Sequence, residues 1–150
     1  MPSLSIPSPV GPVTIEEHNG KITAISWGNG GGNGSPLLAE AGRQLTDYFA
    51  GKRRHFDLPL APGGSPFESR VWAAMQTIPY GETRTYSELA HMTDSGPRAV
   101  GGACGKNPIP IVIPCHRVLA KSGLGGYSGE GGLATKQRLL TLEGALLLTS

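Results

Sequence analysis

The chain has 150 residues, of which 38% are hydrophobic and 16% charged, so it is long enough to bury a core in one domain or two small lobes. The formal net charge is +2: residues 66–150 hold eight Lys/Arg against six Asp/Glu, while residues 1–65 hold five of each. This charge is compatible with nucleic-acid binding without establishing it, and no apolar run approaches the ~20 residues of a membrane helix.

The start of the chain and its cysteine and histidine content indicate a compartment and exclude common cofactors. Residues 1–12 lack the basic and then apolar pattern of a signal peptide, so we expect a cytoplasmic protein, or a nuclear one in a eukaryote. Two cysteines, Cys104 and Cys115, cannot build a disulfide framework. The four histidines fall in no zinc spacing, so we expect no metal, no cofactor and no membrane partner.

The first third of the chain predicts short strands followed by one helix. Residues 13–19 and 21–27 are rich in β-branched residues and meet at Asn19-Gly20, which is a strong hairpin signal. The glycine-rich residues 28–36 predict a loop, and residues 37–51 have the apolar spacing of a helix. Residues 55–62 predict a further short strand, and the APGGSP stretch places a lobe boundary at 61–65.

The rest of the chain carries two helix-start signatures. Ser65 and Glu68 flank a proline in a capping-box pattern, which predicts a helix running to about residue 78. Thr85 and Glu88 form a second capping box, for a helix that ends near residue 92. A turn at 94–97 then leads into the small residues 98–104. This pair of short helices predicts a helix-turn-helix, although many such pairs never contact DNA.

The stretch NPIPIVIPCHRV, residues 107–118, holds the strongest candidate for chemistry. Three prolines stiffen an apolar approach to Cys115, a setting that by itself raises the pKa of a thiol and makes it inert. His116 and Arg117 are adjacent and would favour the reactive thiolate. Cys115 is either this nucleophile or a buried structural cysteine, and Glu143 either orients His116 or is an ordinary solvated glutamate. We expect Cys104 to be structural and to pack against the segment that carries Asn107.

Residues 114–118, PCHRV, resemble the signature of the O6-alkylguanine-DNA alkyltransferase family, the methylated-DNA–protein-cysteine methyltransferases. The resemblance continues in the family's order through FESRVWAAMQTIPYGETRTYSELA (67–90), RAVGGACGKNPIPIVIPCHRV (98–118), GYSG (126–129) and LLTLEG (139–144). It covers most of residues 66–144, whereas residues 1–65 match only loosely.

The resemblance implies an α+β fold in two lobes. Residues 1–62 are expected to form an RNase H-like scaffold lobe, with a small β-sheet and a helix. Residues 63–150 are expected to form a mostly helical, winged-helix-like lobe that contains the helix-turn-helix and the active-site cysteine. The implied partner is double-stranded DNA that contains O6-alkylguanine. We expect a monomer in solution, and the sequence leaves cooperative binding along DNA open.

The implied reaction is DNA repair by direct reversal, in a single turnover. Cys115 attacks the alkyl carbon on guanine O6, with O4-methylthymine as a further candidate substrate, and becomes a permanent thioether. His116 takes the thiol proton through a water, and Glu143 holds His116. Asn107 steadies the turn before the active-site segment, and Tyr86 helps to turn the nucleotide out and donates a proton to the leaving guanine.

The resemblance also implies a set of residues that contact DNA. Arg98 fills the place that the flipped base vacates, which offsets part of the few kcal/mol that flipping costs. The small residues Gly101, Gly102 and Ala103 let the recognition helix approach the DNA backbone. The remaining expected contacts to DNA or to the flipped base come from Arg117, from the main chain of Cys115 and Val118, and from Tyr127 and Ser128.

Three other functions compete with this one. An alkyltransferase-like lesion sensor binds DNA without efficient transfer, but such proteins replace the cysteine that is present here. A Cys–His hydrolase would need an oxyanion hole and a different spacing, and a structural DNA-binding module would leave the Cys-His-Arg cluster unused. The chain also departs from the family pattern: residues 91–97 are about two residues shorter, and Glu130 is added near the expected base pocket.

Overall fold

A computed structural model of the chain describes residues 2–32, 34–120 and 132–145. The chain divides into two compact units, Met1–Gly63 and Gly64–Ser150. Across the described ranges, no helix combines the length and the apolar character needed to cross a bilayer.

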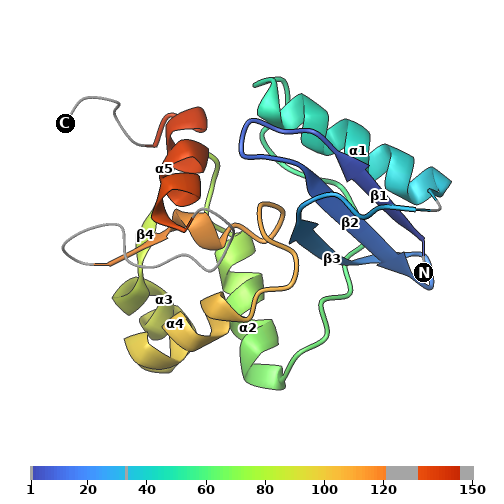
Figure 1. Ribbon diagram of the computed structural model, residues 1–150. Coiled ribbons are helices and arrows are strands. Elements are labelled where there is room, and N and C mark those ends of the chain that lie inside the picture. Colours follow the sequence, from blue (N-terminus) through green and yellow to red (C-terminus); the bar gives the residue numbers. More distant parts are fainter. Residues whose placement is uncertain (1, 33, 121–131, 146–150) are drawn as a thin grey trace. The chain divides into compact units, whose positions relative to one another are not determined.

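The first unit is built on a three-stranded antiparallel sheet in the order β1-β2-β3 (Figure 1). Its strands are β1 (Ser3–Ile6), β2 (Val13–His18) and β3 (Lys21–Trp27). Asn19 and Gly20, between β2 and β3, have φ of 53° and 75°. Positive φ at both central residues is what a tight hairpin turn of matching twist requires, so the hairpin prediction is confirmed.

Helix α1 (Pro36–Phe49) packs against β1 and β2 and closes the core of the first unit (Figure 1). It begins at Ser35, whose hydroxyl accepts a hydrogen bond from the Leu38 amide at 3.1 Å. Leu38, Leu45 and Tyr48 are fully buried, as the helical spacing of residues 37–51 predicts. Each fully buried side chain of this size contributes roughly 1.5–3 kcal/mol to folding.

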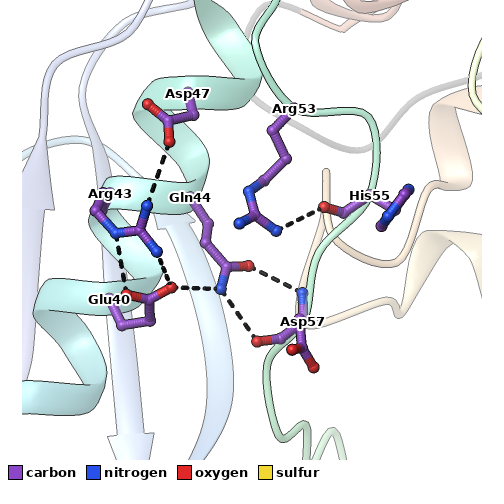
Figure 2. A network of polar contacts seen from close by, with 7 residues as sticks. All are labelled: Glu40, Arg43, Gln44, Asp47, Arg53, His55 and Asp57. Atoms are coloured by element: carbon purple, nitrogen blue, oxygen red, sulfur yellow. Dashed lines mark hydrogen bonds and ion pairs between the residues drawn. The ribbon is translucent and has the colours of Figure 1, made fainter.

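The segment after α1 is held by Gln44 and by an isolated backbone bridge to β3 rather than by a continuous strand. Gln44 is 2% exposed; its amide donates to the Asp57 carbonyl at 3.1 Å and accepts from the Asp57 amide at 2.9 Å (Figure 2). The predicted strand at 55–62 is wrong: only an isolated bridge joins Leu60 to Ile22 of β3. Prolines at 59 and 62 lack amide donors, so a continuous ladder cannot form, and Gln44 supplies the missing pairing.

The glycine-rich loop lies along the outer edge of β1. The amides of Gly30 and Gly31 donate to the Ser5 hydroxyl at 3.1 and 2.7 Å, and the Gly32 amide donates to the Ser3 hydroxyl at 3.0 Å. A Cβ at Gly31 would collide with the backbone of Ser5 and Leu4, whereas one at Gly32 would meet nothing within 4 Å. The loop therefore covers a strand edge that would otherwise be open to pairing with another chain.

Gly31→Ala is expected to lower the free energy of unfolding by about 1–3 kcal/mol, because backbone atoms must move to admit the new methyl group. Gly32→Ala is the matched control, and we expect it to leave stability unchanged or to raise it by about 0.4–1 kcal/mol through the unfolded chain. Urea denaturation of both variants measures the difference; equal midpoints would contradict the packing of this loop on β1.

The second unit is mostly helical. Its elements are α2 (Pro66–Gln76), β4 (Arg84–Thr85), α3 (Tyr86–Met92), α4 (Pro97–Gly105), the 3-10 turn η1 (Cys115–Arg117), β5 (Val118–Leu119) and α5 (Leu133–Leu142). Both predicted capping boxes are present, Ser65 with Glu68 on α2 and Thr85 with Glu88 on α3. Helices α3 and α4 pack together as the predicted helix-turn-helix pair (Figure 1). The parallel pairing of β4 with β5 is too short for a sequence pattern to indicate.

Helix α2 packs against both helices of the helix-turn-helix pair, α3 and α4. The Trp72 indole donates to the Ala103 carbonyl at 2.9 Å, and the Cys104 thiol lies 3.7 Å from the Met75 sulfur. Cys104 is buried, as expected of a structural cysteine. Its sulfur contacts Met75 of α2, and its carbonyl accepts from the Asn107 amide at 3.3 Å.

Candidate active site

The loop that leads to Cys115 is closed by a single side chain. Asn107 donates from Nδ2 to the Ile113 carbonyl at 2.8 Å and accepts from the Ile109 amide at 3.0 Å. Within this loop Ile111 has φ of 75°, an uncommon conformation for a β-branched residue that the surroundings must impose. Asn107 therefore joins two points of the loop that precedes Cys115 and η1, a geometry compatible with the turn-steadying role predicted for it.

Cys115 is 6% exposed, and burial raises the pKa of its thiol above the ordinary value of 9.0. A side-chain hydrogen bond from Asn107 and the positive charge of Lys136 oppose this rise in pKa without cancelling it. The resting residue is therefore a protonated thiol at neutral pH. Because the thiolate is the nucleophilic form, the site needs a group that removes the proton.

His116 is fully buried, and its Nε2 lies 2.8 Å from Oε2 of Glu143. Burial lowers the pKa of the imidazole, and the positive charges of Arg117 and Lys136 lower it too, while the hydrogen bond and charge of Glu143 raise it. The net result is a neutral ring. An ionised carboxylate only accepts hydrogen bonds, so Nε2 carries the proton and donates to Glu143.

The second ring nitrogen of His116, Nδ1, is buried and has no hydrogen-bond partner among the described residues. In a neutral ring whose Nε2 is protonated, Nδ1 is the acceptor. A buried acceptor without a partner lowers the stability of the folded protein, so its presence calls for a functional explanation. Nδ1 is thus a free proton acceptor on the residue next to the thiol.

Glu143 caps the carboxyl end of α5 and accepts hydrogen bonds from two residues, His116 and Arg117. Its Oε2 accepts from His116, and its two oxygens accept from Nε and Nη2 of Arg117 at 2.8 and 2.9 Å. Burial by itself would raise the pKa of this carboxyl, but the hydrogen bonds from His116 and Arg117 hold the pKa at about 2. Glu143 is therefore a buried carboxylate, and not the solvated glutamate of the alternative interpretation.

The position of Arg117 differs from the sequence expectation that it contacts DNA. Its guanidinium is 7% exposed, binds Glu143 through two nitrogens and donates from Nη1 to the Ile78 carbonyl at 2.8 Å. It also lies 5.8 Å from the centre of the Tyr80 ring. With its nitrogens bound to protein acceptors, this side chain is part of the buried cluster and is not a surface contact for phosphate or base.

Lys136 is a site residue that sequence reasoning missed. It is fully buried on α5, donates from Nζ to the Val118 carbonyl at 2.7 Å and lies 5.8 Å from the centre of the Tyr86 ring. Burial lowers the pKa of its ammonium group. One sequence signal was available: Lys136 precedes Glu143 by seven residues, a spacing that places both on the same helix face.

Comparison with known proteins assigns the chain to a family. The model of the 6-O-methylguanine DNA methyltransferase DNA binding domain matches residues 66–145, and that of the ribonuclease-like domain matches residues 4–62. The chain is a member of the 6-O-methylguanine DNA methyltransferase family. This confirms the family resemblance.

Relatives and solved structures agree with this assignment. The chain is 42% identical to the constitutive methylated-DNA–protein-cysteine methyltransferase of Bacillus subtilis, over 82% of this chain and 84% of the relative. It is 43% identical to that of Mycobacterium leprae, over 97% and 94%. The Mycobacterium tuberculosis OGT structure in complex with DNA superposes with a TM-score of 0.87 at 42% identity, covering 97% of this chain and 94% of that one. The predicted α+β fold is thereby confirmed.

Helix α4 is the helix that the family resemblance predicts to face DNA. Arg98, at its second position, is exposed, as is Gly102, and a Cβ at Gly101 or Gly102 would meet nothing within 4 Å. The protein's own packing therefore does not require glycine at 101 or 102. Ala103 differs: it is 4% exposed and its carbonyl is bound by Trp72, so it belongs to the core and not to the DNA-facing surface.

The remaining expected site residues divide into two groups. Tyr86 is half-buried at the start of α3, and Val118 is fully buried in β5, next to η1. Tyr127, Ser128 and Glu130 lie outside the described residues. Among the described residues, Asn107 and Lys136 act on the Cys115 thiol, and Glu143 joins His116 to Arg117.

Proposed function

We propose that this protein repairs double-stranded DNA by transferring the alkyl group from O6 of guanine to Sγ of Cys115. The observation that carries the proposal is the buried thiol next to a neutral imidazole whose Nδ1 is free and whose Nε2 is held by Glu143. This is the arrangement of an activated nucleophile with an oriented base. Its membership of the methyltransferase family supports the same reaction.

The reaction proceeds in one direction. The thiol proton passes through a water to Nδ1 of His116, and the Glu143 carboxylate stabilises the imidazolium that forms. The sulfur lone pair forms the S–C bond as the C–O6 bond breaks. The electrons of the broken C–O6 bond stay on guanine, which takes a proton from Tyr86. A neutral thioether is a poor electrophile with no good leaving group, so the S–C bond persists and each molecule acts once.

DNA binding is assigned to the exposed side of α4. The alkyl carbon is inaccessible in a stacked base, so the nucleotide must turn out of the duplex before it reaches a thiol that is 6% exposed. Arg98 occupies the vacated place in the stack, and Gly101 and Gly102 allow the DNA backbone to approach closely. The protein acts as a monomer, and phosphate contacts make its affinity fall as salt rises.

One experiment tests the transfer. The protein is incubated with a duplex that contains a single O6-methylguanine, and its intact mass is then measured. We expect a gain of one methylene per protein molecule, mapped to Cys115, with no further turnover when more DNA is added. Tight binding without a mass change would identify a lesion sensor or a structural DNA-binding module and would refute the proposal, as would repeated turnover.

A further inference from the structure

Arg117 has no role in the proton relay described above, yet each of its three guanidinium nitrogens donates to a protein acceptor. It spans from η1 to the two Glu143 oxygens at the end of α5 and to the Ile78 carbonyl just after α2. The Tyr80 ring lies beside its guanidinium. Burying a charged group is costly unless its partners compensate. Because Arg117 is only 7% exposed, its role must lie in its effect on neighbouring residues of the protein.

We propose that Arg117 is a positioning residue of the relay: its guanidinium fixes the Glu143 carboxylate, and its charge keeps the His116 imidazole neutral until the thiol proton arrives. The inference rests on the proposed function for the origin of that proton. It replaces the sequence expectation of a DNA contact with an electrostatic role inside the protein.

The charges around His116 carry this inference. Glu143 faces the ring from α5 and favours the imidazolium, while Arg117 on η1 and Lys136 on α5 favour the neutral ring. The thiols of Cys115 and Cys104 are uncharged at rest, because burial raises the pKa of both. With Arg117 present, the Glu143 carboxylate already has a cationic partner. Without Arg117, His116 would become the cationic partner by taking a proton from water.

An imidazolium formed in that way cannot accept the thiol proton. The neutral ring that the relay needs would then exist only at higher pH, so the acid limb of the transfer rate would move upward. Arginine suits this position better than lysine, because its planar fork donates to both carboxylate oxygens and to the Ile78 carbonyl at once. A lysine would keep the charge but lose part of the fixed geometry.

The test compares two substitutions at one position in the full-length protein. Arg117→Gln removes the charge and retains a donor for Glu143, while Arg117→Lys retains the charge and loses the fork. Arg138→Met, at an exposed arginine on α5, is the control for the loss of one positive charge. Circular dichroism first establishes that each variant is folded at the temperature used.

The direct readout is the pH titration of the His116 ring by NMR, without DNA, with His18, His55 and His91 as internal controls. We expect the His116 midpoint to rise by about one pH unit in Arg117→Gln and to stay low in Arg117→Lys and Arg138→Met. The acid limb of methyl transfer should move in the same direction. Transfer below the new midpoint would then fall about tenfold for each pH unit, relative to the variant's own plateau.

Unchanged His116 titration in Arg117→Gln would overturn the inference, as would a raised midpoint in Arg117→Lys. If Arg117→Gln binds undamaged duplex more weakly, with a salt dependence that corresponds to about one phosphate contact fewer, Arg117 contacts DNA as the sequence predicted. If Arg117→Gln does not fold, a raised His116 midpoint in Arg117→Lys still overturns the inference, because that variant retains the charge. A wild-type protein that gains no methyl group from DNA refutes the proposed function, whereas the titration is measured without DNA and judges Arg117 separately.

Discussion

Cys115→Ser is expected to abolish methyl transfer from O6-methylguanine DNA, to below the detection of a single-turnover assay. A hydroxyl has a far higher pKa than a thiol, and its oxygen is a much weaker nucleophile than sulfur towards an alkyl carbon, so the neighbouring imidazole does not compensate for the loss of the sulfur. The substitution changes one atom in a residue that is 6% exposed, so we expect binding to lesion-containing duplex to be retained. The measurement pairs the intact mass of the protein with the methyl content of the recovered DNA.

Cys104→Ala is the matched control for the second cysteine. Burial raises the pKa of the Cys104 thiol to about 12, so the thiol stays protonated at neutral pH, and its sulfur contacts Met75 on α2. We expect the variant to take up one methyl group per molecule, as the wild type does, although it is less stable because a buried side chain is shortened. Lesion removal by Cys115→Ser, or a methyl group mapped to Cys104, would show that the reactive sulfur has been misassigned.

Glu143→Gln is expected to lower the free energy of unfolding by about 3–5 kcal/mol, because it leaves the buried Arg117 guanidinium without its counter-charge. The amide also presents an NH₂ group to donors on His116 and Arg117, where an acceptor stood before. Urea denaturation at neutral pH measures the loss. Glu82→Gln breaks an exposed ion pair with Arg84 and should change stability by no more than about 1 kcal/mol.

The same cluster makes the wild-type protein sensitive to acid. The pKa of His116 is lowered on folding, so the neutral ring contributes stability above its ordinary pKa of 6.5, and this is lost as pH falls below that value. Glu143 has a pKa of about 2 when folded and 4.5 ordinarily, so its contribution is present above pH 4.5 and is lost towards pH 2.

Thermal denaturation between pH 7 and pH 3 tests this linkage. We expect the melting temperature of the wild type to fall first below about pH 6.5 and then again below about pH 4.5. In Glu143→Gln the second fall should be smaller, because that carboxyl no longer titrates. A melting temperature that stays constant to pH 4 in the wild type would contradict the buried, neutral state of His116.

Local sequence patterns predicted the hairpin turn and the helix starts, because the contacts that form these features lie within a few residues of one another. Asn19-Gly20 predicts the hairpin because only a few residue types tolerate positive φ at both positions. The capping boxes at Ser65 and Thr85 satisfy helix amides within three residues, so they place the starts of α2 and α3. The PCHRV segment likewise predicts Cys115 as the nucleophile and His116 as its base, since the two residues are adjacent in the chain.

Tertiary structure decided the parts that depend on residues far apart in the chain. Glu143 lies 27 positions after His116, and the Ile78 carbonyl 39 positions before Arg117, so no local pattern reveals that these groups meet. The direction in which a side chain points is set by the packing of helices and turns, which left Arg117 inside rather than on the DNA-facing surface. For the same reason Lys136 resembles any helix residue in the sequence, whereas in the structure it is buried and its charge acts on the Cys115 thiol.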